Sequence, residues 1–205
     1  MQRARRDQIV EAAIKALAEH GVRATFANIV AAGGLSSPGL ISYHFRDRVE
    51  LLEAVLEHVG SLRADATQRA LAMIDPADHG AKLVAVLTAD LEPLTSQPTL
   101  FGAVVEAFHE LRSADGRLRH LGDDEVGKMA TIRAVLQDGQ DAGAFDRSFD
   151  ASMTARILDG AKTQFLASFA RRPDLDVDAF ASTLLEMADA VARPRTPRNS
   201  GMGES

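Results

Sequence analysis

The sequence lacks residues on which several classes of protein depend. Its 205 residues include no cysteine and no tryptophan. Without cysteine, the chain can form neither disulfide bonds nor thiolate metal sites. Aromatic residues are also scarce, with nine Phe and one Tyr, whereas alanine and leucine are abundant. Because helices favour alanine and leucine and strands favour β-branched and aromatic residues, we expect an all-α protein.

Long hydrophobic runs are absent as well. A membrane-spanning helix needs about 20 consecutive apolar residues, and the sequence contains no such run and no apolar signal segment at its start. Hydrophobic residues make up 46% and charged residues 25%, which is typical of a globular chain. We therefore expect a soluble, cytoplasmic protein that has no membrane partner.

Basic residues are fewer than acidic residues in the chain as a whole, which gives a net charge of −6. The shortage is uneven. Residues 1–48 contain seven Arg or Lys against four Asp or Glu, whereas the other 157 residues contain 16 against 25. Contact with nucleic acid needs a basic surface locally and not a basic protein. The division predicts a small DNA-binding head on an acidic body.

Residues 25–48 are the segment that predicts how the head binds. Gly33-Gly34 separates two short helical stretches, which is the layout of a helix-turn-helix. We expect Thr25 to cap the first stretch, and Ser36 or Ser37 to cap the second, with Pro38 in its first position. An ordinary corner between two helices of a helical protein is the alternative interpretation.

The rest of the chain shows apolar residues at helical spacing. Further helices are predicted over 2–20, 48–73, 81–92, 124–142, 150–170 and 176–192, with another that opens at Gln97-Pro98. In all, we expect about nine helices. The predicted organisation is a DNA-binding head (1–48), a connecting helix (49–73), a ligand-binding and dimerisation domain (74–193) and a disordered tail (194–205).

Three arginines, Arg3, Arg5 and Arg6, crowd the start of the first predicted helix. Cations at a helix N-terminus oppose the helix dipole, at a small cost that a nearby phosphate would reverse. A solvated, frayed terminus explains them equally well.

A series of short motifs runs through the first 52 residues. They are Ala-Glu-His-Gly at 18–21, Thr25, Ile-Val-Ala-Ala-Gly at 29–33, Ser-Ser-Pro-Gly-Leu-Ile-Ser-Tyr-His-Phe at 36–45 and Arg-Asp-Arg-x-Glu-Leu-Leu at 46–52. In these motifs the sequence resembles the TetR-like (tetracycline-repressor-like) transcriptional regulators. Two departures are a Tyr that stands at 43 where the family commonly has it at 42, and a glycine turn one residue longer.

The resemblance implies a dimeric repressor that a small-molecule ligand releases from a near-palindromic operator in double-stranded DNA. It implies phosphate contacts by Thr25, Tyr43, His44 and Arg48, and base contacts from the second helix. The predicted DNA-binding residues are Thr25, Asn28, Ser36, Ser37, Pro38, Gly39, Leu40, Ser42, Tyr43, His44 and Arg48.

Two further sites are predicted in the body. An apolar wall with few polar groups is typical of a ligand pocket, and its candidates are Phe101, Val105, Phe108, His109, Met129, Ile132, Arg133 and Phe165. Wide apolar stripes on the last two helices favour an isologous dimer, and the predicted interface is Met153, Ile157, Ala161, Phe165, Phe180, Leu184, Leu185 and Ala188. Core packing is the better explanation for most of the pocket candidates taken one by one, and it alone explains most of the apolar stripes.

The alternatives to DNA binding are a metal enzyme and a helical adaptor. Glu106 and His109 form a Glu-x-x-His step, as in di-iron helical bundles, but the chain has no second copy of that step. Phosphate-binding loops, nucleophile elbows and zinc-protease helices are missing too. We therefore expect no enzyme, no metal and no cofactor. A helical adaptor without DNA affinity is disfavoured by the charge division.

Overall fold

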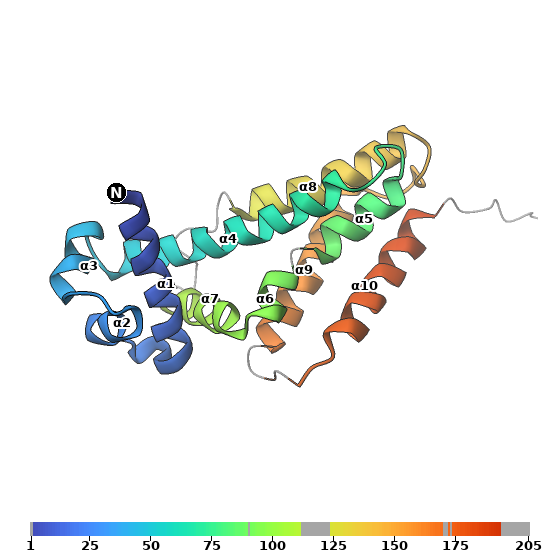
Figure 1. The fold of residues 1–205 in the computed structure, drawn as a ribbon. Helices are drawn as coiled ribbons and strands as arrows, with labels where there is room; N and C mark the ends of the chain where they lie inside the picture. Colours follow the sequence, from blue (N-terminus) through green and yellow to red (C-terminus); the bar gives the residue numbers. More distant parts are fainter. Residues whose placement is uncertain (1, 90, 112–123, 170–171, 173, 194–205) are drawn as a thin grey trace, which may run out of the picture.

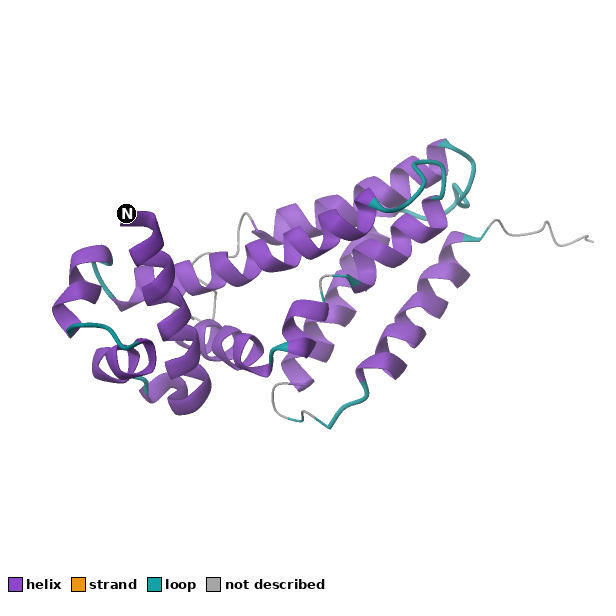
Figure 2. Ribbon diagram, in the orientation of Figure 1, coloured by secondary structure: helices purple, strands orange, loops and turns teal. Residues whose placement is uncertain are grey.

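The computed structural model describes residues 2–89, 91–111, 124–169, 172 and 174–193. Throughout this part the chain is helical and has no strand, which confirms the all-α prediction (Figure 2). The predicted disordered tail, 194–205, lies outside the described residues. Within them, no helix combines the length and the apolar character needed to cross a bilayer.

The helices form a small head joined to an elongated body (Figure 1). In the figure the head lies at the left, α4 runs from it along the body, and α8, α5, α9 and α10 lie at the other end. The helices are α1 (Gln2–His20), the 3-10 turn η1 (Gly21–Arg23), α2 (Phe26–Gly33), α3 (Pro38–His44), α4 (Arg48–Ala72), α5 (His79–Thr88), α6 (Glu92–Ser96), α7 (Pro98–Glu110), α8 (Asp124–Asp141), α9 (Ala151–Phe169) and α10 (Val177–Ala192).

The predicted helix over 81–92 is wrong as a single element. The structure places α5 at His79–Thr88 and a separate short helix, α6, at Glu92–Ser96. Pro93 was expected to end a helix, but it lies in the first turn of α6. A proline is tolerated there because its missing N–H would have no partner within the helix.

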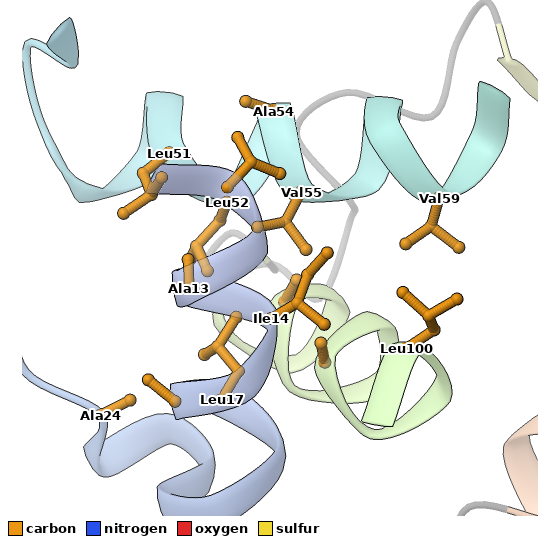
Figure 3. Packing of buried hydrophobic residues seen from close by; sticks show 14 of the residues in the cluster. Ala13, Ile14, Leu17, Ala24, Leu51, Leu52, Ala54, Val55, Val59 and Leu100 are labelled. Carbon is orange, nitrogen blue, oxygen red and sulfur yellow. The ribbon is translucent and has the colours of Figure 1, made fainter. Parts of the chain in front are cut away.

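One hydrophobic core joins the head to the body. Ile9, Ile14 and Leu17 of α1 pack with Leu52 and Val55 of α4. Side chains of α7, among them Leu100, complete the same cluster, as Figure 3 shows. The predicted head therefore has no separate core, because α7 of the body packs directly on α1.

A second core holds the far end of the body together. It gathers buried side chains from α5, α8, α9 and α10, including Leu87, Leu136, Leu158 and Leu184. The turn after α8 closes over this core. There the side-chain amide of Gln140 donates to two carbonyl oxygens further along the chain, both at 2.9 Å.

Gly139 of α8 is needed where this turn folds back. A Cβ at this position would lie 2.1 Å from Cδ2 of Phe145, whose ring is buried in the second core. We expect Gly139→Ala to lower the free energy of unfolding by about 1–3 kcal/mol, because the ring has to leave its position.

Urea denaturation provides the measurement, with Gly60→Ala as the matched control. Gly60 lies inside α4, and a Cβ there would meet nothing within 4 Å. The control should gain up to about 1 kcal/mol from the better helix propensity of alanine. Equal effects of the two substitutions would contradict the packing argument.

Candidate nucleic-acid interface

A hydrogen-bonded cap fixes the start of α2. The Oγ1 atom of Thr25 accepts from the backbone N–H of Asn28 at 3.2 Å, and Oδ1 of Asn28 accepts from the backbone N–H of Thr25 at 2.9 Å. These two bonds form a reciprocal capping box. The predicted cap is confirmed. Because the side-chain oxygen of Asn28 is used in the cap, a DNA contact by this residue would have to come from its NH2 group.

The two glycines of the turn have different tasks. Gly34 adopts the left-handed conformation, with φ 58°, and ends α2. Glycine reaches this region without the steric cost that a Cβ imposes. Gly33 instead permits close contact between helices, since a Cβ there would lie 2.4 Å from Cβ of Ala12 in α1. Together they hold α2 against α1 and let the chain turn into α3.

Two buried side chains hold α3 on the rest of the head. Ile41 and Phe45 are 0% and 1% exposed and belong to the first core. Pro38 lies in the first turn of the helix, as predicted. Ser37 occupies the N-cap position but its side chain makes no capping bond, so that part of the prediction is wrong. The orientation of α3 therefore depends on packing and not on its cap.

The outer surface of α3 carries most of the predicted DNA-binding residues. Those that are exposed are Ser36, Ser37, Pro38, Gly39, Ser42 and Tyr43, whereas Leu40 and His44 are half-buried. The side chain of Tyr43 is 74% exposed, and its ring meets that of His44 edge to face at 5.1 Å between centroids. A short helix that presents this surface can enter a major groove.

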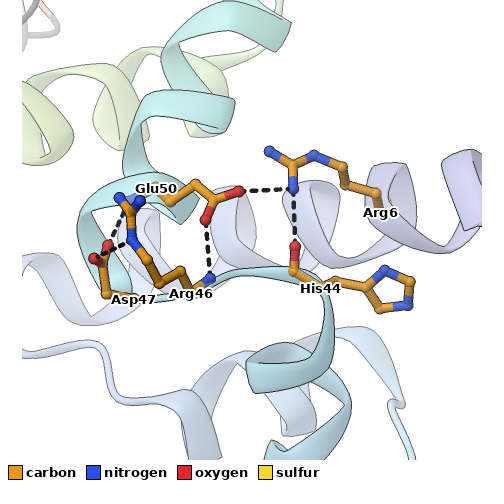
Figure 4. A network of polar contacts seen from close by, with 5 residues as sticks. All are labelled: Arg6, His44, Arg46, Asp47 and Glu50. Carbon is orange, nitrogen blue, oxygen red and sulfur yellow. Dashed lines mark hydrogen bonds and ion pairs between the residues drawn. The ribbon is translucent and has the colours of Figure 1, made fainter.

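An ion-pair network fixes the end of α3 to α1 and α4 (Figure 4). Nη1 of Arg6 donates to the backbone oxygen of His44 at 2.9 Å and to Oε1 of Glu50 at 3.2 Å. Its guanidinium also lies 4.1 Å from the centre of the Phe45 ring. The second oxygen of Glu50 accepts from the backbone N–H of Arg46 at 2.9 Å. One arginine of α1 thus holds the segment that follows α3.

Hydrogen bonds in this network stabilise two charged carboxylates. The backbone N–H of Arg46, and after it the guanidinium of Arg6, lower the pKa of Glu50. Asp47 caps α4 by accepting from the backbone N–H of Glu50 at 2.9 Å. That bond, and then the side chain of Arg46, lower the pKa of Asp47. Both carboxylates therefore remain ionised and hold the start of α4 at neutral pH.

The guanidinium of Arg48 is bound within the protein. Its Nη2 donates to Oε2 of Glu110 in α7 at 2.8 Å, its Nε pairs with the other oxygen, and Nη1 donates to the backbone oxygen of Ala24. Its side chain is only 26% exposed. The predicted phosphate contact by Arg48 conflicts with this arrangement, because the guanidinium is occupied within the protein. The side chain instead connects α4, the segment before α2, and α7.

A cleft between α1 and α3 lies beside the exposed aromatic ring. Its volume is about 550 Å³, and it is lined by Gln2, Ala4, Arg5, Gln8, Leu40, Tyr43 and His44. The residues of α1 were not among those predicted to bind DNA. The cluster of arginines at the start of the chain was the signal in the sequence, but it did not distinguish one arginine from another.

Comparisons with known proteins agree with this geometry. Residues 9–55 match the family model described as bacterial regulatory proteins, tetR family. That range contains α2, α3 and the start of α4. The head of the chain is therefore TetR-like.

Curated relatives and solved structures extend the comparison. The HTH-type transcriptional regulator BetI of Yersinia pestis (strain Pestoides F) is 34% identical over 93 residues, which are 45% of this chain and 46% of that relative. The match thus spans about half the length of the relative. A TetR transcription regulator from Haloarcula marismortui ATCC 43049 has the same fold, with a TM-score of 0.77, 23% identity and coverage of 93% and 100% of the two chains.

A third similar fold is that of the transcriptional regulator FadR from Bacillus subtilis in complex with stearoyl-CoA. Its TM-score is 0.74 at 19% identity, and the match covers 91% of this chain and 99% of that one. The likeness over the body is therefore one of fold, whereas the likeness in the TetR-like head is also one of sequence.

The predicted ligand pocket, which lies in the body behind the TetR-like head, is not gathered into one wall. Phe101 lies in the first core and Ile132 in the second. Arg133 is exposed, so its prediction as a polar group inside the body is wrong. Val105, Met129 and Phe165 are half-buried. The side chains of Phe108 and His109 lie outside the part that the structure describes.

The predicted dimer interface divides into an inner and an outer part. Leu184 and Ala188 are 2% and 3% exposed and pack in the second core, which α5 completes, so they are removed from the interface. Met153 and Ile157 of α9 are 56% and 58% exposed. On α10 the exposed apolar residues are Met187 and Val191, which were not predicted.

A groove of about 560 Å³ continues the α9 surface towards α10. Its lining includes Ala161, Phe165 and Phe180 of the predicted interface. The rings of Phe165 and Phe180 stack with centroids 3.9 Å apart. Leu185 is half-buried against the second core. The part of the predicted interface that remains accessible is therefore the exposed side of α9 together with this groove.

A double-mutant cycle measures the connection between Arg48 and Glu110. We expect Arg48→Ala and Glu110→Ala each to destabilise the protein, and the pair to show a coupling free energy of about 1 kcal/mol, because the two side chains are partly buried and form two bonds. Urea denaturation of the four proteins gives this value.

Arg193 and Asp189 provide the control cycle. Their ion pair measures 2.6 Å, but the side chains are 75% and 53% exposed. Solvent screening should make their coupling clearly weaker than that of the partly buried pair. A coupling for Arg48 and Glu110 that is no larger than that of the control would show that the connection contributes nothing beyond a surface pair.

Proposed function

We propose that the chain is a DNA-binding transcriptional regulator that acts in the cytoplasm as a dimeric repressor. The observation that carries the proposal is the surface of α3. It presents small polar residues and Tyr43 outward, while Ile41 and Phe45 fix the helix on the core. In a helix-turn-helix, such a helix lies in the major groove, and neighbouring groups contact the phosphates.

A dimer would place two copies of α3 in successive major grooves. Centre-to-centre separations of about 34–36 Å, one turn of DNA, or multiples of it, fit an operator with approximate two-fold symmetry. The exposed apolar side chains of α9, Met153 and Ile157, support an interface there, since exposed apolar patches mark association surfaces. Such an interface would be isologous, with the same surface on both protomers.

A small-molecule effector bound in the body would act through the shared core. The two candidate routes to the head are α4, which runs from Asp47 into the body, and α7, which packs on α1 and binds Arg48 through Glu110. An effector changes DNA affinity only if it binds one arrangement of these helices better than the other. The stearoyl-CoA of FadR is a property of that protein, and the effector proposed here is a small molecule without further assignment.

The enzyme interpretation rested on Glu106 and His109. The carboxylate of Glu106 lies at the junction with the head, since a Cβ at Gly21 would be 3.4 Å from it. Among the residues described, no group of three or more His, Asp or Glu is arranged to hold a metal ion. The matched family consists of regulators, and no comparison supports the enzyme or the adaptor.

Selection of bound fragments from the host's genomic DNA tests the proposal. The full-length protein should enrich fragments that share a near-palindromic sequence. Tyr43→Ala should weaken binding to every enriched fragment, because a phosphate contact carries no base preference. Met73→Ala, a substitution at a side chain that is 88% exposed on α4's C-cap, is the matched control. Recovery of fragments without any common sequence would argue against a specific operator.

The dimer is tested by introducing a charge on α9. Ile157→Glu should yield monomers in sedimentation velocity, because the interface would have to bury an unpaired carboxylate. Ile157 is 58% exposed in the protomer, so the fold itself should tolerate the change. Met73→Glu adds the same charge elsewhere and should leave the dimer intact. If Ile157→Glu remains dimeric, the interface lies on another surface.

A further inference from the structure

The cleft between α1 and α3 is lined by groups that can donate hydrogen bonds. Arg5 supplies a guanidinium, Gln2 and Gln8 supply amides, and Tyr43 supplies a hydroxyl, whereas no Asp or Glu lines the cleft. Nη1 of Arg5 donates to Oε1 of Gln8 at 2.7 Å. This partner is neutral, so it orients the guanidinium and leaves its positive charge uncompensated. A cleft that combines these donors with a net positive charge favours an anion.

Two neighbouring arginines of α1 differ in their surroundings. Arg6 is paired with Glu50, bound to the backbone oxygen of His44 and placed over the ring of Phe45. Arg5 is exposed, and within residues 2–89 and the other described ranges it forms no ion pair. Removing Arg6 from its position would break a network that holds α3, whereas Arg5 can accept a ligand without loss of an internal ion pair.

From these observations we infer that the cleft is a phosphate subsite, in which Arg5, oriented by Gln8, binds a phosphodiester of the DNA backbone. The inference rests on the proposed function, because α3 must lie in the major groove for the cleft to meet the strand at its edge. Tyr43 and His44 belong both to α3 and to the cleft, so the subsite continues the recognition surface. Arginine suits a phosphate because its planar donors bind two oxygens at once.

The position of the subsite follows from the order of its residues along α3. Tyr43 and His44 lie in the last turn of that helix, whereas Pro38 and Gly39, which the family resemblance assigns to base edges, lie in its first turn. Leu40, assigned to the same role, lines the cleft from the middle of the helix. A phosphate in the cleft therefore belongs to the strand at the edge of the groove that faces the end of α3. Arg5 would position the head on the duplex and would add little preference for particular bases.

The test compares Arg5→Gln with Arg3→Gln in the full-length protein. Both substitutions remove one positive charge from the exposed start of α1, but only Arg5 lines the cleft. Fluorescence anisotropy with an operator duplex, obtained from the genomic selection, is measured over a range of salt. In the proposed dimer Arg5→Gln removes one charge-assisted hydrogen bond from each of two protomers, so binding should weaken about a hundredfold. The slope of log affinity against log salt should fall by about two, because each protomer loses one phosphate contact.

The phosphate that Arg5 binds can be identified by replacing single DNA phosphates with neutral methylphosphonates. Single methylphosphonates are placed in turn along the operator strand. At one position the wild-type protein should lose about tenfold in affinity, and Arg5→Gln should lose no more at that position, because the contact is already absent. A free anion or another ligand in the cleft would leave this series without such a position, and that result would overturn the inference.

The possible outcomes separate the inference from the proposed function. If the wild-type protein binds no DNA, the function itself is wrong. Alternatively, the wild-type protein binds specifically while Arg5→Gln and Arg3→Gln have the same affinity and the same salt slope. That result supports the proposed function and contradicts the phosphate subsite. Circular dichroism of both variants confirms that each is folded, so that a loss of binding by Arg5→Gln alone supports the subsite.

Discussion

The packing of α1 against both α4 and α7 is the constraint on which the rest of the structure depends. Ile9 and Leu17 of α1 are 0% and 1% exposed. Complete burial of such side chains contributes about 1.5–3 kcal/mol each relative to exposure. The ion pair between Arg48 and Glu110, a partly buried hydrogen-bonded contact, contributes about 1 kcal/mol. The core therefore holds the head on the body, and the ion pair adds a polar contact between α4 and α7.

This difference in magnitude matters for any response to an effector. A close-packed core changes between discrete arrangements and does not deform gradually. Since α7 packs on α1 and α1 packs on α2, a displacement of α7 has to be followed by the head. Arg48 would accompany that motion, because it binds the backbone oxygen of Ala24 just before α2. The contact between Arg48 and Ala24 would thus couple the movement of α4 to that of α2, while the apolar contacts of the first core supply the stability.

Features that depend on neighbouring residues were predictable from the sequence. Thr25 caps α2, and Gly34 ends it in the left-handed conformation, because the chemistry of each is decided within a few residues. Helix positions in the body followed from periodicity. Pro93 was misassigned because a proline both ends one helix and begins another, and only the fold shows which applies.

Features that depend on distant partners were not predictable. A helical stripe shows that Leu184 and Ala188 face something apolar, but α5 of the same protomer and a second protomer are equally good partners in sequence. In the structure, Leu184 and Ala188 pack in the second core with residues of α5. Arg48 has the right chemistry for a phosphate, yet its acidic partner Glu110 lies 62 residues away. Residue type and local motif carry no information about such a pairing.

Charge in the head illustrates why a count of basic residues does not define a DNA-binding surface. Residues 1–48 carry a net charge of +3, but Arg6, Arg46 and Arg48 are each paired with a carboxylate. A paired cation can contact phosphate only by giving up its partner or sharing it, which reduces the gain. The free energy of DNA binding must then come mainly from cations that form no ion pair among the described residues, and Arg5 is the one that lies in a cleft beside α3. The electrostatic part of the proposed recognition would then be shifted from the start of α4, where the sequence motif places it, to the start of α1.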